Sequence, residues 1–186
     1  MPIPRRTLFV NKLLCGYRSN MVSSAATSHR VNNLAGSIPA VLSNLTRLTA
    51  LALPLNGLTG PIPTFLGNFS ELYFLSLGGN QLSRSVPPAL GNIPALTILS
   101  LLTNNLDGDL SFLFSLSKCR KIQLLELANN SFTGGRSHRK PVNGINFYRY
   151  RKLTGRLPST LSNLSNLESI GLSNNLLTGE IPESIS

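Results

Sequence analysis

Residues 75–82 read Leu-Ser-Leu-Gly-Gly-Asn-Gln-Leu, and this frame of leucines and asparagine decides the fold. The same frame stands 24 residues earlier, at 51–58, and 24 residues later, at 99–106. It continues less regularly at residues 125–130 and 170–175. A fixed internal period of this length predicts a solenoid, in which each repeated unit packs on its neighbours.

The residue types of the frame explain how it packs. Alternate side chains of a strand lie on one face, so both leucines of each Leu-x-Leu step point into the interior, and we expect one buried column of Leu53, Leu77, Leu101 and Leu127. The asparagine amide carries donors and an acceptor, so it can bond the buried backbone of adjacent turns. We therefore interpret the spaced asparagines as structural: Asn32, Asn56, Asn80, Asn104, Asn130 and Asn175.

A second motif follows each strand. It reads Leu-Thr-Gly-Pro-Ile-Pro at 58–63, with variants at 34–39, 82–87, 153–158 and 177–182. The glycine permits a bend and the proline ends a strand ladder, because proline has no backbone donor. A Leu-x-Asn-Leu step comes next and predicts a short helical or 3-10 turn. The expected fold is an α/β-type repeat solenoid with parallel strands on a concave face and short helical and irregular segments on the convex side.

These motifs resemble plant-type leucine-rich repeats. Residues 32–186 look like the extracellular domain of plant leucine-rich-repeat receptor-like kinases, of the immune and pattern-recognition receptor subfamily. The resemblance implies a plasma-membrane or extracellular glycoprotein in defence or developmental signalling, with a peptide or protein ligand and a co-receptor as partners. Full-length relatives would carry a serine/threonine kinase domain. Secreted inhibitors of pathogen wall-degrading enzymes share the repeat, so such an inhibitor, or a truncated product without activity, is the alternative.

The net charge of +10 comes from segments outside the repeats. Residues 1–31 form a basic N-terminal segment that we expect to be irregular and not a repeat. Repeats follow at 32–135, a basic segment replaces a repeat at 136–152, and repeats resume at 153–186 without a cap. A reading-frame change would explain residues 136–152, and a loop that binds nucleic acid or an anionic surface is the alternative. Because that segment lacks a leucine column, we expect residues 153–186 to be less stable than the first repeats.

The sequence has no convincing secretory signal and no membrane span. Asn11 and Lys12 interrupt the first apolar stretch, and no later apolar run is long enough to cross a bilayer. We therefore expect a fragment of a longer receptor gene, with no kinase motif of its own.

Catalytic and metal-ligating constellations are also missing from the sequence. The two histidines, His29 and His138, fall in irregular segments, and we expect Cys15 and Cys119 to be free thiols. The expectation is a binding module that is not an enzyme and has no catalytic residue, no cofactor, no metal and no nucleic-acid partner.

The concave face is the expected binding surface, because repeat proteins use such faces for partners. The residues predicted to contact the partner lie between or beside the strand leucines: Phe74, Ser76, Ile98, Ser100, Leu102, Leu124 and Glu126. We expect Phe74 to be the main anchor, since aromatic residues dominate interface energetics. Four Asn-x-Ser/Thr sequons are candidate glycosylation sites if the chain is secreted: Asn44, Asn68, Asn129 and Asn163. Asn44, Asn68 and Asn163 share one repeat phase, which we expect on the convex side.

Overall fold

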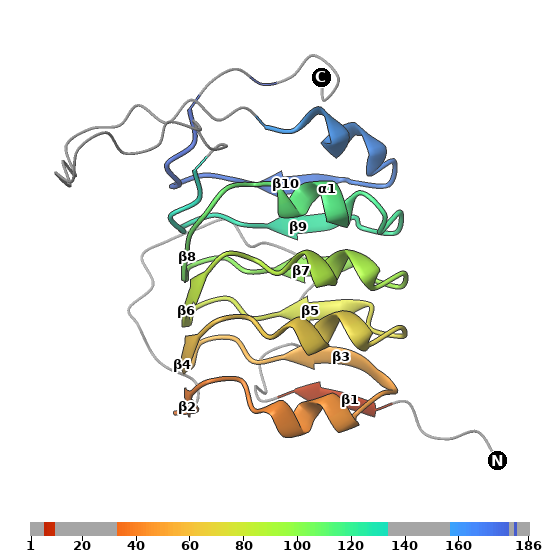
Figure 1. Cartoon of the computed structure of the whole chain (residues 1–186), viewed down its shortest axis with the longest axis vertical. Coiled ribbons are helices and arrows are strands. Elements are labelled where there is room, and N and C mark those ends of the chain that lie inside the picture. The colour runs from red at the N-terminus through yellow and green to blue at the C-terminus, as the bar shows by residue number, and fades with distance from the viewer. Residues whose placement is uncertain (1–5, 10–32, 134–156, 179–180, 182–186) are drawn as a thin grey trace, which may run out of the picture.

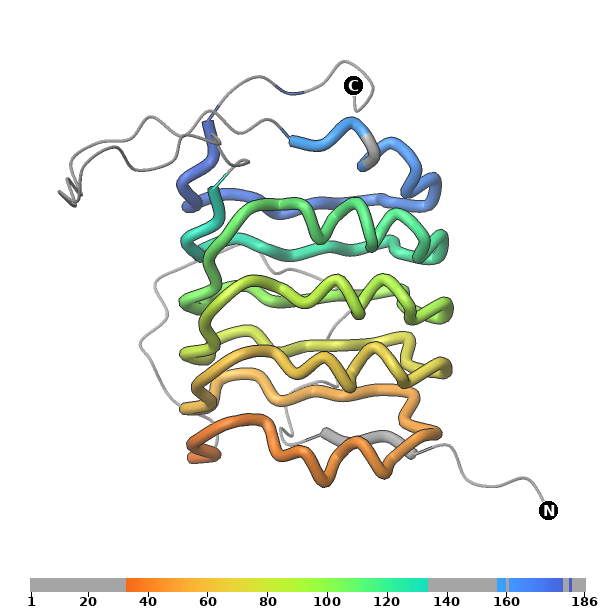
Figure 2. Tube along the Cα trace, in the orientation of Figure 1, coloured from red at the N-terminus to blue at the C-terminus, as the bar shows by residue number. Residues whose placement is uncertain are grey.

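The computed structural model of the protein describes residues 6–9, 33–133, 157–178 and 181. Within these residues the chain winds through a stack of similar turns, and the order of the turns along the stack follows the sequence (Figure 1, Figure 2). Each turn, called a level here, carries a short strand on one side and a short helix on the opposite side.

The main sheet has six strands, all parallel to their neighbours, in the order β1-β3-β5-β7-β9-β10. Its strands are β1 (Arg6–Phe9), β3 (Leu48–Ala52), β5 (Phe74–Ser76), β7 (Ile98–Ser100), β9 (Leu124–Glu126) and β10 (Ser169–Gly171). Leu51 pairs with Leu75, Leu75 with Leu99, and Leu99 with Leu125. Equivalent positions of successive levels therefore lie side by side, which confirms the predicted solenoid.

Two further sets of elements complete each level. A smaller parallel sheet consists of β2 (Ala35–Gly36), β4 (Gly57–Gly60), β6 (Gln81–Arg84) and β8 (Asn105–Leu106). The convex side carries η2 (Ala40–Asn44), η3 (Thr64–Asn68), η4 (Pro88–Asn92), α1 (Phe112–Leu116) and η5 (Ser159–Asn163). A proline precedes each 3-10 helix with φ between −71° and −66°, because its fixed φ and missing donor suit that position.

The core lies between the main sheet and the helices. Leu53 is 3% exposed, and Leu77, Leu101 and Leu127 are fully buried, so the predicted leucine column is confirmed. Phe112 and Phe132 are buried in this core, and their ring centroids lie 5.7 Å apart. At about 25 cal/mol per Å² of apolar surface, this continuous packing is the main source of stability.

A ladder of asparagine side chains ties the levels together. The Asn80 amide Nδ2 donates to the Leu77 carbonyl (2.9 Å) and to the Leu53 carbonyl of the preceding level (3.0 Å). Its Oδ1 accepts the Leu58 amide proton at 3.1 Å. Asn104, Asn130 and Asn175 repeat the pattern, which confirms the structural interpretation; Asn32 lies outside the described residues.

The residue before each ladder asparagine has a positive φ. This position holds Gly79 in one level but Leu55 (φ 53°) and Thr103 (φ 54°) in others, where a side chain costs energy. The bend at the end of the smaller-sheet strand also requires a positive φ, and Arg84 (φ 69°) stands there where Gly60 (φ 78°) stands one level earlier. These are positions at which the sequence departs from the conformational preference of the repeat.

The stack has no empty level where the sequence analysis expects a replaced repeat. Strand β10 pairs directly with β9, and the Leu127 amide donates to the Gly171 carbonyl at 2.8 Å. Residues 157–178 therefore pack on the level that ends at Thr133. The lower stability expected for residues 153–186 stays a prediction. Residues 136–152 themselves, and the proposed frame change, lie outside the described part of the chain.

The N-terminal segment contributes one strand that the sequence analysis did not expect. Within residues 1–31, Arg6–Phe9 forms β1 and pairs in parallel with β3. The other residues of that segment lie outside the described ranges. No helix in the described ranges is long and apolar enough to cross a membrane.

Candidate ligand-binding face

The outer surface of the main sheet brings the predicted contact residues together. Phe74 pairs with Ile98, and Ile98 with Leu124, so three apolar side chains form one row. Ser76, Ser100 and Glu126 form the next row by the same register. Leu102 lies beside them, because a Cβ built on Gly78 would come within 3.1 Å of its Cγ. We call these seven residues the strand face.

Burial divides the strand face into two parts. Phe74 is 7% exposed, Ser76 4% and Ser100 1%, whereas Ile98, Leu102, Leu124 and Glu126 are half-buried. Phe74 belongs to a small apolar cluster with Ala50 and Ala52, separate from the interior core. Phe74 is thus less exposed than Ile98 and Leu124 of the same row, and its role as the main anchor stays a prediction.

A polar ladder on the exposed rim of this face was missed by the sequence analysis. The Asn129 Nδ2 donates to Thr103 Oγ1 at 3.2 Å, and the Asn174 Nδ2 donates to Asn129 Oδ1 at 2.6 Å. All three residues have positive φ and precede a ladder asparagine. The available signal was the Asn-Asn pair at 129–130 and again at 174–175.

The four sequons occupy two different environments. Asn44, Asn68 and Asn163 are exposed and end the 3-10 helices η2, η3 and η5, as expected for the convex side. Asn129 instead follows β9 and uses its amide nitrogen in the polar ladder. Asn129 therefore does not share the convex position of the other three sequons.

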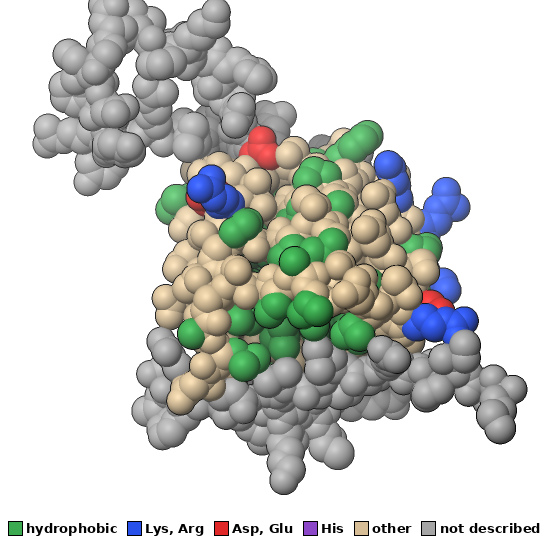
Figure 3. Space-filling view, turned by 60° about the horizontal axis from the view of Figure 1, so that its bottom comes forward, with side chains coloured by type: hydrophobic (Ala, Val, Ile, Leu, Met, Phe, Trp, Pro, Cys, Tyr) green, Lys and Arg blue, Asp and Glu red, His purple; other side chains and the backbone are tan. Residues whose placement is uncertain are grey.

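The described residues carry little chemistry beyond packing and hydrogen bonding. They contain no group of three or more residues that could hold a metal ion, and their one ion pair joins exposed Arg47 and Glu71 at 4.0 Å. Cys119 is a free, fully buried thiol, as predicted, and burial raises its pKa against the smaller lowering by a backbone hydrogen bond at Ile93. In Figure 3 the apolar side chains lie among polar uncharged groups and backbone, and most of the Lys and Arg seen there lie along one edge.

Comparison with known proteins agrees with this architecture. The family model for the Leucine Rich Repeat matches residues 71–93 and 166–186. The chain is a leucine-rich-repeat solenoid. This solenoid is 33% identical to the plant peptide hormone receptor RGFR1 solved in complex with RGF2, with a TM-score of 0.68 over 83% of this chain and 21% of that one.

Two further solved structures are also similar to this chain. The leucine-rich-repeat ectodomain of the Arabidopsis thaliana receptor kinase GASSHO1/SCHENGEN3, in complex with CASPARIAN STRIP INTEGRITY FACTOR 2, is 37% identical, with a TM-score of 0.63 over 83% of this chain and 19% of that one. A plant ice-binding protein is 25% identical, with a TM-score of 0.60 over 80% of this chain and 48% of that one. No curated protein sequence matches the chain.

The repeats are similar to those of plant receptor-kinase ectodomains. The solenoid spans about a fifth of the length of the two receptor chains. The ice-binding protein shows that the same fold also serves an unrelated purpose. The fold therefore supplies a surface, and the residues on that surface decide the ligand.

Proposed function

We propose that this solenoid recognises a peptide or protein ligand through its strand face, as part of a receptor-like-kinase ectodomain in plant defence or developmental signalling. The observation that carries the proposal is the set of half-buried apolar residues on the strand face, Ile98, Leu102 and Leu124, on a continuous parallel sheet. Receptor ectodomains with similar repeats were solved with a peptide hormone bound. A co-receptor, an extracellular location and glycosylation belong to the same proposal.

The face suits an extended peptide that runs across the levels. Equivalent positions of neighbouring strands lie about 4.8 Å apart, and an extended ligand rises about 3.3 Å per residue, so a few ligand residues reach across several levels. Leu102 and Leu124 offer apolar contacts, and Glu126 adds a carboxylate in the adjacent row. The exposed polar ladder through Asn129 and Asn174 gives amide groups at the rim for the ligand backbone.

The test is selection of ligands from a phage-displayed library of random linear peptides on the immobilised chain. Peptides that bind should lose at least tenfold in affinity, about 1.4 kcal/mol, for the double variant Leu102→Ser and Leu124→Ser. The matched control is Phe114→Ser, which removes an apolar side chain that is 62% exposed on α1, on the opposite side of the solenoid. Affinity for the control should be unchanged.

A second variant covers the case in which the double variant loses stability. Ser169→Arg adds a long side chain at an exposed position of β10 that pairs with Leu124, so it blocks the same row without removing a buried group. It should weaken the same peptides. The proposal fails if no peptide is enriched, or if Phe114→Ser weakens binding as much as the strand-face variants do.

A further inference from the structure

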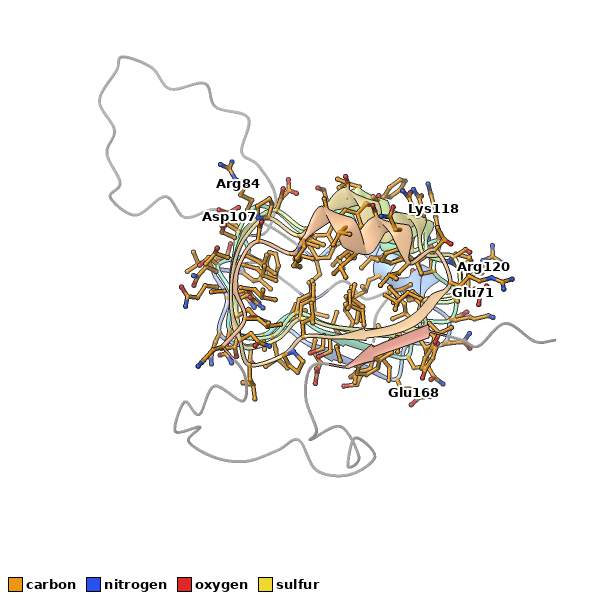
Figure 4. All side chains as sticks on the ribbon, turned by 90° about the horizontal axis from the view of Figure 1, so that it is seen from below. Glu71, Arg84, Asp107, Lys118, Arg120 and Glu168 are labelled. Atoms are coloured by element: carbon orange, nitrogen blue, oxygen red, sulfur yellow. The ribbon has the colours of Figure 1, made fainter. Side chains whose placement is uncertain are left out.

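A cleft opens on the convex side between the level of α1 and the level of η5. It has a volume of about 510 Å³ and is lined by Ser117, Lys118, Arg120, Asn163 and Ser165. Lys118 and Arg120 point outward from the same side of the solenoid in Figure 4. We name it the convex cleft and infer that it binds a small oxyanion, such as a sulfate or carboxylate group, between Lys118 and Arg120.

Register between the levels explains which residues meet there. The Ile93 amide donates to the Leu90 carbonyl, and the Cys119 amide donates to the Leu116 carbonyl in the next level. Leu90 and Leu116 are therefore equivalent positions, and Ser117, which follows Leu116, is equivalent to Gly91, which follows Leu90. The equivalent bond from Leu164 to Leu161 puts Asn163 in the position of Lys118. Ser165 therefore corresponds to Arg120, and each cation of one level lies next to a neutral polar side chain of the next.

Ser117 distinguishes the level of the cleft from the two levels before it. At Gly67 an added Cβ would lie 2.2 Å from the Ala89 carbonyl oxygen, and at Gly91 it would lie 2.2 Å from the Ser115 carbonyl oxygen. Those glycines thus allow close backbone approach of the next helix. Ser117 carries the side chain that the glycines lack and donates its hydroxyl to the Phe114 carbonyl at 2.7 Å. The close backbone approach that the glycines allow at η3 and η4 is therefore not available at Ser117.

The charges in the convex cleft favour an anion. Among the described residues, no carboxylate lies within 4 Å of Lys118 or Arg120. The carboxylate of Glu168 instead accepts the Gln123 amide at 3.0 Å. The Asn166 amide fastens the cleft edge by donating to the Arg120 carbonyl at 2.6 Å. An ammonium and a guanidinium beside neutral donors form the charge-assisted hydrogen bonds that oxyanions prefer.

The binding test uses the full chain produced without glycans, so that Asn163 is unmodified. Amide chemical shifts are followed by nuclear magnetic resonance during addition of sodium sulfate, with sodium chloride holding the ionic strength constant. Saturable shifts are expected at residues 117–120 and 163–165. The double variant Lys118→Gln and Arg120→Gln should bind at least tenfold more weakly. Sodium acetate, titrated in the same way, distinguishes a planar carboxylate from a tetrahedral anion, and saturable binding of either at this cleft supports the inference.

Lys121→Gln is the matched control. It removes the same charge from an exposed residue adjacent in sequence that does not line the cleft, and it should change the affinity less than twofold. Equal weakening in Lys121→Gln would show general attraction to a chain of net charge +10 and would overturn the inference. Shifts that do not saturate, or that spread over the other basic residues, would overturn it as well.

Discussion

Replacing Asn80 with alanine tests how much one rung of the asparagine ladder contributes to stability. The side chain makes bonds to Leu53, Leu58 and Leu77 at 2.9–3.1 Å, and it is 7% exposed. Alanine leaves the Leu58 N–H without its partner, and Leu58 is 3% exposed. An unmet buried group costs about 1–3 kcal/mol, and two carbonyls lose a donor besides, so we expect a loss of roughly 3 kcal/mol.

The assay is thermal and urea unfolding followed by circular dichroism. For a chain of this size a loss of roughly 3 kcal/mol lowers Tm by about 6–12 °C. Asn92→Ala is the control, because Asn92 is exposed at the end of η4 and should change stability by less than about 0.5 kcal/mol. If both variants lower Tm equally, the ladder does not connect the levels as described.

Asn80→Asp separates the donor role of the amide from its acceptor role. The introduced carboxyl keeps an acceptor for the Leu58 amide but faces the Leu53 and Leu77 carbonyl oxygens, where a charged oxygen is repelled. Its folded-state pKa is therefore raised above the usual value of about 3.9. The variant should be closest to the parent protein below that pH and lose stability as pH rises through the folded-state pKa. A pH-independent difference would contradict this reasoning.

Three further changes test other features. Arg84→Gly relieves a side chain held at φ 69° and should raise stability by roughly 0.5–1 kcal/mol, seen as a higher urea midpoint; a lower midpoint would contradict the strain. Gly67→Ala places a Cβ 2.2 Å from the Ala89 oxygen and should lower stability by about 2–3 kcal/mol in the same assay, whereas Ser43→Ala, at the equivalent exposed position of η2, should be neutral. Burial raises the folded-state pKa of Cys119, so folding keeps the thiol protonated. The resulting contribution to stability is present below the usual thiol pKa of about 8.5 and is lost as the pH rises from there through the folded-state pKa. Cys119→Ala removes this group, so its Tm should fall less between neutral and alkaline pH than that of the parent protein.

Features that repeat locally could be predicted from the sequence. Leu77 and Asn80 stand in a frame that recurs along the repeats. Strand alternation places the Leu77 side chain in the interior, and the Asn80 amide supplies hydrogen bonds to the buried backbone. The helical turn beginning after Pro87 follows from the same repetition. The structure at these positions depends on contacts with the adjacent levels, and the period of the sequence indicates which residues those contacts join.

Features set by longer-range packing could not be predicted in this way. The burial of Phe74 depends on what packs across the strand face, and the repeat frame places only its backbone. The direct pairing of Ser169 with Leu124 depends on hydrogen bonds between strands, whereas counting residues from Asn130 suggests an intervening level. Loop length has a small effect on such pairing, because closure entropy grows only with the logarithm of length.

The glycine position on the convex side also sets the curvature of the whole arc. Where Gly67 and Gly91 stand, adjacent helices approach to backbone contact, and where Ser117 stands a side chain takes the same position. Because the strands on the other side keep a constant hydrogen-bonded spacing, a wider helix spacing tightens the bend of the sheet. One small side chain, far from any ligand on the strands, therefore adjusts the radius of the surface that the ligand meets.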